Sequence, residues 1–310
     1  MRNHFSISPE EGFDEILHRY EESTLNDHAE YFDVDELEVI IDYYLQKGRQ
    51  NDSLKAIELG LKLHPNSTPI RARKAKLDIS KGKYKEALKI IEEINEIETF
   101  DIDNLLLQGE ILVKLKRHKE AELVFEKALN SEFEAKDQLC LDIAFIFLNE
   151  MLYDYSLKYL LRGNKINPQN LDLLYELAFN YKQKEKADEA IDVYNKIIDL
   201  EPYSSEAWFN LGQLFFVKED YEKAIQAFDF ATTIDDKDSM AWLQKGHAYF
   251  QNESYTKAIE AYSKYMEQTS YKDIPLVYIG ECYEKLENYE KAMECYLKVI
   301  KEDDQNTDAL

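Results

Sequence analysis

The stretch SEAWFNLGQLFFVKEDYEKAIQAFDFATTIDD, residues 205–236, decides how the rest of the chain is interpreted. With Ser205 counted as position 1, the pattern is set by positions 4, 8, 11, 20 and 24, which are Trp208, Gly212, Phe215, Ala224 and Phe228. Positions 4, 8 and 11 share one face of a helix, and positions 20 and 24 share one face of a second helix. The stretch therefore predicts a pair of helices that approach closely at the small residues, with Trp208 in their core.

The same pattern returns every 34 residues along most of the chain. Position 20 is small each time, if one extra residue near Phe133 is allowed: Ser53, Ala87, Ala121, Ser156, Ala190, Ala224, Ala258 and Ala292. We therefore predict an array over residues 34–306 with eight repeats, which begin at Val34, Thr68, Ile102, Asp137, Leu171, Ser205, Ser239 and Asp273. Residues 1–33 would be an acidic N-terminal segment with a capping helix, and residues 307–310 the start of a further repeat or a tail.

The key positions are those of the tetratricopeptide repeat, and the chain resembles tetratricopeptide-repeat proteins over about nine tenths of its length. This resemblance implies an all-α fold, a right-handed superhelical solenoid of about eight helix-turn-helix repeats. It also implies that ligands bind on the concave side, which the first helix of each repeat lines. A fold of this kind does not by itself identify the partner that it binds.

Charge and composition narrow the classes of partner. The chain has 38 basic and 62 acidic residues, a formal net charge of −24, and such a chain repels nucleic acid and anionic membranes. Neither a secretory signal nor an apolar run long enough to cross a bilayer is found, so we expect a cytoplasmic protein. The three cysteines lie in helical patterns without paired spacing, and we expect them to be buried apolar residues.

No motif of a catalytic or metal site is found. The signatures HExxH, GxSxG, GxxxxGK[ST] and GxGxxG are missing, and the six histidines are scattered. We therefore predict a protein that is not an enzyme, with no catalytic residue, no metal and no cofactor. Aspartates cluster at the repeat junctions, at Asp33, Asp101 and Asp238 among others, where we expect them to cap helix N-termini.

The N-terminal segment contains a predicted helix outside the repeats. Ser8, Pro9 and Glu11 are typical of a helix start with a capping box. The apolar residues that follow share one face: Phe13, Ile16, Leu17 and Tyr20. This face either covers the flank of the first repeat or docks in the groove of the same or a neighbouring molecule.

The resemblance implies that positions 2, 5, 9, 12 and 13 of each first helix form a stripe along the concave side. The residue types of this stripe change along the chain. The stripe is mostly acidic in the first three repeats, whereas the middle repeats place aromatic and amide side chains there. Two explanations compete: curvature of the array hides the stripe between neighbouring first helices, or the stripe is a groove for a partner. The candidate partner-binding residues of this groove are Phe145, Asn149, Tyr175, Phe179, Lys182, Phe209, Asn210, Gln213, Phe216, His247, Phe250 and Gln251.

The functional prediction is a non-catalytic scaffold that binds a peptide or helix of a partner protein in this groove. We expect a partner with apolar or aromatic anchors, with room for basic flanks beside Asp103, Glu110, Glu281 or Glu284. The lysine and asparagine of chaperone-tail clamps are missing from positions 5 and 9. One alternative is a substrate-recruiting or regulatory arm of a longer enzyme that continues past residue 310. Another is self-association through an uncapped C-terminal end.

Overall fold

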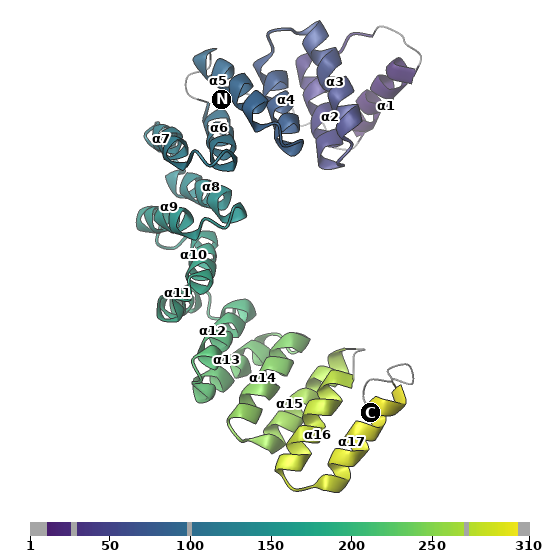
Figure 1. The fold of residues 1–310 in the computed structure, drawn as a ribbon, viewed down its shortest axis with the longest axis vertical. Helices are drawn as coiled ribbons and strands as arrows, with labels where there is room; N and C mark the ends of the chain where they lie inside the picture. The colour runs from purple at the N-terminus through teal and green to yellow at the C-terminus, as the bar shows by residue number, and fades with distance from the viewer. Residues whose placement is uncertain (1–10, 26–29, 98–100, 270–272, 303–310) are drawn as a thin grey trace. The chain divides into compact units, whose positions relative to one another are not determined.

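The computed structural model describes residues 11–25, 30–97, 101–269 and 273–302 (Figure 1). These residues form seventeen α-helices and no strand, which confirms the predicted all-α fold. The predicted helix start at Ser8 and Pro9 and the predicted start of a further repeat at residues 307–310 lie outside the described residues. The helices are α1 (Glu11–Leu25), α2 (Val34–Gln46), α3 (Gln50–Leu63), α4 (Thr68–Ser80), α5 (Tyr84–Ile97), α6 (Ile102–Lys114), α7 (His118–Leu129), α8 (Lys136–Asn149), α9 (Tyr153–Ile166), α10 (Leu171–Gln183), α11 (Ala187–Leu200), α12 (Ser205–Val217), α13 (Tyr221–Ile234), α14 (Ser239–Gln251), α15 (Tyr255–Gln268), α16 (Asp273–Lys285) and α17 (Tyr289–Glu302).

The helices divide into two compact units, unit 1 (Met1–Leu152) and unit 2 (Tyr153–Leu310). Unit 1 contains α1–α8, and unit 2 contains α9–α17. Within each unit, helices that follow one another in the chain pack side by side, as α12 to α15 do in green in Figure 1. A first helix inside a unit therefore contacts the second helix of its own repeat and that of the preceding repeat, as α12 contacts α13 and α11.

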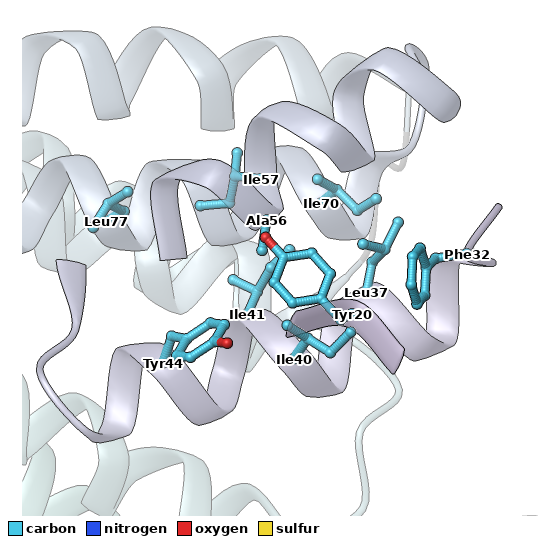
Figure 2. Close-up of a cluster of buried hydrophobic side chains, with 10 residues drawn as sticks. All are labelled: Tyr20, Phe32, Leu37, Ile40, Ile41, Tyr44, Ala56, Ile57, Ile70 and Leu77. Atoms are coloured by element: carbon cyan, nitrogen blue, oxygen red, sulfur yellow. The ribbon is translucent and has the colours of Figure 1, made fainter. Parts of the chain in front are cut away.

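The N-terminal core of unit 1 is formed by α1 to α4 (Figure 2). Tyr20 of α1 is only 2% exposed, and Ile16 and Leu17 of the same helix pack against this cluster. The ring of Phe13 lies 5.2 Å from the ring of Tyr43, centroid to centroid. The apolar face of α1 thus covers α2 and its neighbours.

Close approach of the paired helices depends on glycine at position 8. A Cβ atom on Gly109 would lie 2.0 Å from Cε1 of Phe125, and one on Gly246 would lie 2.4 Å from Cε1 of Tyr262. The aromatic partners stand at position 24 of the same repeats, so the ring occupies the space that a side chain at position 8 would need. This is the small-to-large packing that the sequence pattern predicts.

The turn inside every repeat has a left-handed residue at position 15. Its φ angle is positive in each case, at Gly48, Gly82, Lys116, Met151, Glu185, Glu219, Glu253 and Glu287. This conformation ends the first helix, and glycine is the residue type that adopts it without steric strain.

The junction aspartates cap helices, as predicted. Asp33 Oδ1 accepts a hydrogen bond from the backbone N–H of Glu36 (2.8 Å), and Oε2 of Glu36 accepts one from the backbone N–H of Asp33 (3.1 Å), which completes a capping box. Asp101 Oδ1 accepts from the N–H of Asp103, and Asp238 Oδ1 accepts from Ala241. The N-capping interpretation is therefore confirmed.

The predicted core position of Trp208 is wrong. Its side chain is only half-buried, with the ring stacked on Phe230 at 4.3 Å between centroids. Its Nε1–H donates to the carbonyl of Pro202 (2.9 Å), in the junction before α12. The carbonyl of Pro202 thus holds the indole N–H at the edge of the helix pair, where the ring stays half exposed.

The three cysteines are buried and free, which confirms their predicted burial. Burial, with a smaller contribution from the charge of Glu281, raises the pKa of the Cys282 thiol to about 12. A thiol with a raised pKa is a poor nucleophile, so Cys282 acts as a packing residue.

Candidate functional site

Lys182, at the end of α10, joins two neighbouring first helices of unit 2. Its ammonium donates to Oδ1 of Asn210 (2.9 Å) and lies 3.4 Å from Oε1 of Gln213, both on α12. Burial lowers the pKa of Lys182. In the described part of the chain its ammonium has no carboxylate partner, so two neutral amides hold the cation. Such a cation keeps the capacity to bind an acceptor from another molecule.

An open pocket of about 280 Å³ lies beside this lysine. It is lined by Tyr175, Glu176, Phe179, Lys182, Tyr194, Glu206 and Asn210. The ring of Phe179 is 43% exposed, whereas the hydroxyl of Tyr175 is hydrogen-bonded to that of Ser204 (2.7 Å). The pocket therefore combines an exposed ring, a fixed hydroxyl and an ammonium group.

Burial also affects the titrating groups of this pocket. It raises the pKa of Tyr175 and, together with the charge of Asp172, that of Glu176. Tyr194, which is 3% exposed, has a raised pKa for the same reason. The two tyrosine hydroxyls therefore stay protonated at neutral pH and act as hydrogen-bonding groups, not as bases.

The other candidate aromatics of unit 2 pack partly inside their own helix pairs. The ring centroid of Phe209 is 5.9 Å from that of Phe228, that of Phe216 is 5.5 Å from Tyr221, and that of Phe250 is 5.5 Å from Tyr255. Phe209, Phe216 and Phe250 are all half-buried, and Gln251 is exposed. One side of each ring is thus packed and another side is accessible.

His247 belongs to a separate aromatic cluster in unit 2. Its Nδ1 is hydrogen-bonded to the hydroxyl of Tyr262 (2.9 Å), and its ring meets that of Tyr278 edge-on at 4.7 Å between centroids. Burial lowers the pKa of His247, which favours the neutral imidazole. The two remaining candidates, Phe145 (39% exposed) and Asn149, lie on α8 in unit 1.

The structure brings together five of the predicted residues, Tyr175, Phe179, Lys182, Asn210 and Gln213, on α10 and α12. Three further residues line the same pocket and were not predicted from the sequence: Tyr194, Glu176 and Glu206. One signal for Tyr194 was available in the sequence. Five repeats have an aromatic residue at position 24. Four of them have glycine at position 8, whereas the repeat of Tyr194 has Ala178 there.

Family comparisons agree with the repeat pattern. The family described as anaphase-promoting complex, cyclosome, subunit 3 matches residues 183–265, and tetratricopeptide-repeat families match residues 102–134 and 275–306. The chain is a tetratricopeptide-repeat protein. Its predicted solenoid class is confirmed by the paired helices and by the solved structures that resemble it.

Three solved structures share the fold of this tetratricopeptide-repeat protein. The C-terminal part of a tetratricopeptide-repeat-containing protein from Cytophaga hutchinsonii aligns with a TM-score of 0.58 at 17% identity, covering 76% of this chain and 97% of that one. A MamA protein aligns at 0.52 and 23% identity, covering 55% and 92%. MamA from Desulfovibrio magneticus aligns at 0.51 and 20% identity, covering 56% and 99%. These identities show a shared fold alone.

One curated relative matches part of the repeats. The protein O-mannosyl-transferase TMTC1 of Homo sapiens is 23% identical over 135 residues, which cover 42% of this chain. The match spans only 15% of the transferase's own length. The tetratricopeptide fold itself is generally non-catalytic.

Two further observations bear on the chemistry of the tetratricopeptide-repeat protein. Among residues 11–25, 30–97, 101–269 and 273–302, the His, Cys, Asp and Glu side chains form no group suited to hold a metal ion. None of the helices formed by those residues has both the length and the apolar character of a membrane span.

Proposed function

We propose that this protein is a non-catalytic interaction scaffold that binds a peptide or helix of a partner protein on the α10–α12 face of unit 2. The observation that carries the proposal is the pocket in which the exposed ring of Phe179 lies beside Lys182, whose ammonium contacts amides and, among the residues that the structure describes, no carboxylate. An exposed aromatic ring next to an uncompensated cation suits a partner that offers an apolar anchor and an acceptor.

The residues around the pocket have separate roles in this proposal. Phe179 and Tyr175 contact the apolar or aromatic anchor, while Lys182, Asn210 and Gln213 fix carbonyl or carboxylate oxygens of the partner. The half-buried rings of Phe209, Phe216 and Phe250 extend the surface along the following repeats. Basic flanks of the partner would meet acidic residues such as Glu281 and Glu284 of α16.

A pull-down with matched variants tests this proposal. Wild-type protein, Phe179→Ala and Lys182→Met are immobilised and exposed to extract of the native cells, and captured proteins are quantified by mass spectrometry. Leu161→Ala is the control, because Leu161 is 44% exposed but lies on α9, outside the pocket. Each pocket variant should weaken binding of the same partner by about 2 kcal/mol with an unchanged circular dichroism spectrum. A partner that Phe179→Ala and Lys182→Met retain as well as Leu161→Ala does would contradict the proposal.

Self-association is a second proposed activity, with an observation of its own. Met293, Leu297 and Ile300 follow one face of α17 and are 58%, 45% and 45% exposed. An apolar stripe of this kind can pair with the same stripe of a second copy. Light scattering at rising concentration should show dimers of the wild type and monomers of Leu297→Glu. A wild type that stays monomeric throughout would contradict self-association.

The recruiting-arm alternative is supported by the partial match to an O-mannosyl-transferase. It requires that the repeats belong to a longer polypeptide in the cell. An antibody raised against unit 2 should then detect a species much heavier than 36.6 kDa on a denaturing blot of native extract. A band at the mass of the present sequence would exclude this alternative.

A further inference from the structure

Unit 1 contains a basic segment inside a strongly acidic chain. Residues 71–89 include eight lysines and arginines but only two acidic residues, although the whole chain has a net charge of −24. The segment covers most of α4 and the first part of α5. Surface charges are normally mixed, so a local excess of this size calls for an explanation.

Two of these cations stand at positions that are apolar in most repeats. Arg71 is at position 4, where Leu37, Leu105 and Leu174 are at most 2% exposed. Lys74 is at position 7, which is isoleucine or leucine in five of the eight repeats. Both side chains are half-buried. An apolar side chain at a core position stabilises the fold through its burial, and a cation there does not. Arg71 and Lys74 therefore weaken the local packing of unit 1.

The two cations open onto a pocket of about 340 Å³. It is lined by Leu61, Pro65, Arg71, Lys74, Lys89, Ile90 and Glu93. The guanidinium of Arg71 pairs with the carboxylate of Glu93. Lys74 and Lys89 have no carboxylate partner among the described residues. The lining thus has two uncompensated ammonium groups beside three apolar side chains.

Lys245 lies at the same repeat position as Lys74, and its charge is compensated by a carboxylate of the chain. It is at position 7 of the seventh repeat, and its Nζ lies 2.8 Å from a carboxylate oxygen of Asp229 and 3.1 Å from Oγ1 of Thr232. Its ammonium also lies 4.4 Å from the ring centroid of Trp242. A lysine at position 7 can therefore find its partners within the chain, whereas Lys74 pairs with no carboxylate of the residues that the structure covers.

We propose that this pocket of unit 1 is a second binding site, which takes an acidic segment of a partner protein. Aspartate or glutamate side chains of that segment pair with Lys74 and Lys89, and an apolar side chain between them rests on Leu61, Pro65 and Ile90. The guanidinium of Arg71 can leave the carboxylate of Glu93 and pair with a carboxylate of the partner. A long polyanion such as nucleic acid is disfavoured, because beyond this pocket it meets the acidic remainder of the chain. The site is independent of the α10–α12 pocket.

Fluorescence anisotropy with a labelled peptide that repeats Glu-Leu-Glu tests the second site. The matching Gln-Leu-Gln peptide is the control for charge. We expect the acidic peptide to bind at low salt, with affinity that falls at least about tenfold in high salt, and the glutamine peptide to bind at least about tenfold more weakly. Absence of binding, or equal binding of the two peptides, would overturn the proposal.

Three variants assign the binding to the pocket. Lys74→Ile restores the residue type that this position has elsewhere, so it should fold at least as well as the wild type, and Lys89→Gln changes an exposed side chain. Each should reduce affinity for the acidic peptide about fivefold or more. Lys85→Gln removes the same charge from α5 outside the lining and should change affinity less than twofold, as roughly expected for an unpaired surface charge. Equal losses in all three variants would indicate general attraction and would overturn the site. Tighter binding of a single-stranded oligonucleotide through Lys74 and Lys89 would overturn its assignment to acidic protein segments.

Discussion

Units 1 and 2 use the same repeat positions for opposite kinds of contact. Positions 4 and 26 of one repeat hold Arg71 and Glu93 in unit 1, which form an ion pair. The same positions hold Trp208 and Phe230 in unit 2, whose rings stack at 4.3 Å between centroids. The helix pairs are alike, yet one contact is polar and the other aromatic. The repeat therefore specifies where two side chains meet and leaves open which chemistry joins them.

The face expected to bind ligands differs between the units in the same way. In unit 1, Arg73 Nη2 lies 2.6 Å from Oδ2 of Asp42 and 3.1 Å from Oε2 of Glu38, so the charges of neighbouring repeats compensate one another. In unit 2, Lys182 is the cation that joins two first helices, but it lies at position 12 of its repeat where Arg73 lies at position 6, and its ammonium donates to an amide oxygen of Asn210. In unit 2 the ammonium of Lys182 can therefore still bind a carboxylate of a partner. In unit 1 the ammonium groups that can do so are those around Lys74.

The largest expected effect concerns the packing that both units share. Gly109→Ala in unit 1 and Gly246→Ala in unit 2 should each destabilise the protein by about 2–3 kcal/mol in urea unfolding, because the new Cβ atom overlaps an aromatic ring at position 24. Higher helix propensity of alanine offsets only about 1 kcal/mol of this loss.

A second substitution checks the cause of that loss. Gly109→Ala combined with Phe125→Leu gives the residue types that the fourth repeat has at positions 8 and 24, Ala144 and Leu160, and it should recover part of the stability. If the double variant lost as much unfolding free energy as the two single variants lose together, the overlap with the ring would not be the cause.

The next prediction contrasts the two contacts between positions 4 and 26. Trp208→Ala should destabilise unit 2 by about 2 kcal/mol, less than for a fully buried tryptophan, because the ring is half exposed. Arg71→Ala should change stability by at most about 1 kcal/mol, since it removes a partly exposed ion pair. Thermal unfolding followed by circular dichroism measures both, and equal losses would refute the distinction between the units.

A smaller difference is expected between Arg73 and Lys182. Arg73→Met leaves two carboxylates without their cation and should destabilise unit 1 by about 1–2 kcal/mol near neutral pH. Lys182→Met leaves only neutral amides and removes a cation that burial disfavours, so the loss should stay below about 1 kcal/mol. Urea unfolding of both variants beside the wild type tests this order, and a larger loss for Lys182→Met would contradict it.

Acid should reduce the effect of Arg73→Met. Burial raises the pKa of Glu38, and the charge of Arg73 opposes that rise. The folded chain therefore binds a proton at Glu38 more readily than the unfolded chain does, which favours folding at acid pH and is lost as the pH rises through the folded pKa. Without Arg73 this dependence becomes steeper, so the destabilisation should be smaller at about pH 4 than at neutral pH.

The helix pairs could be predicted from the sequence because position 8, position 20 and position 24 repeat with a fixed spacing that a helical period turns into contacts. The pocket could be predicted only in part, since Phe179 and Lys182 lie on the expected stripe but Tyr194 comes from a second helix assigned to the core. The edge position of Trp208 depends on a carbonyl of the preceding junction, which periodicity does not describe. The basic pocket of unit 1 combines residues from three helices and a turn, so a stripe drawn along first helices could not find it.

The smallest expected effect concerns the left-handed residue at position 15. The first two repeats of unit 1 have glycine there, Gly48 and Gly82, whereas Glu219 and Glu253 of unit 2 adopt φ angles of 61° and 57°. A left-handed residue with a side chain is strained by roughly 1 kcal/mol relative to glycine. Glu219→Gly should therefore stabilise unit 2 by about 0.5–1 kcal/mol, and Gly48→Ala should destabilise unit 1 by a similar amount. Because a Cβ on Gly48 would have no atom within 4 Å, backbone conformation alone determines its effect. Urea unfolding measures both changes, and a stabilised Gly48→Ala would show that unfolded-state entropy outweighs the left-handed strain at this turn.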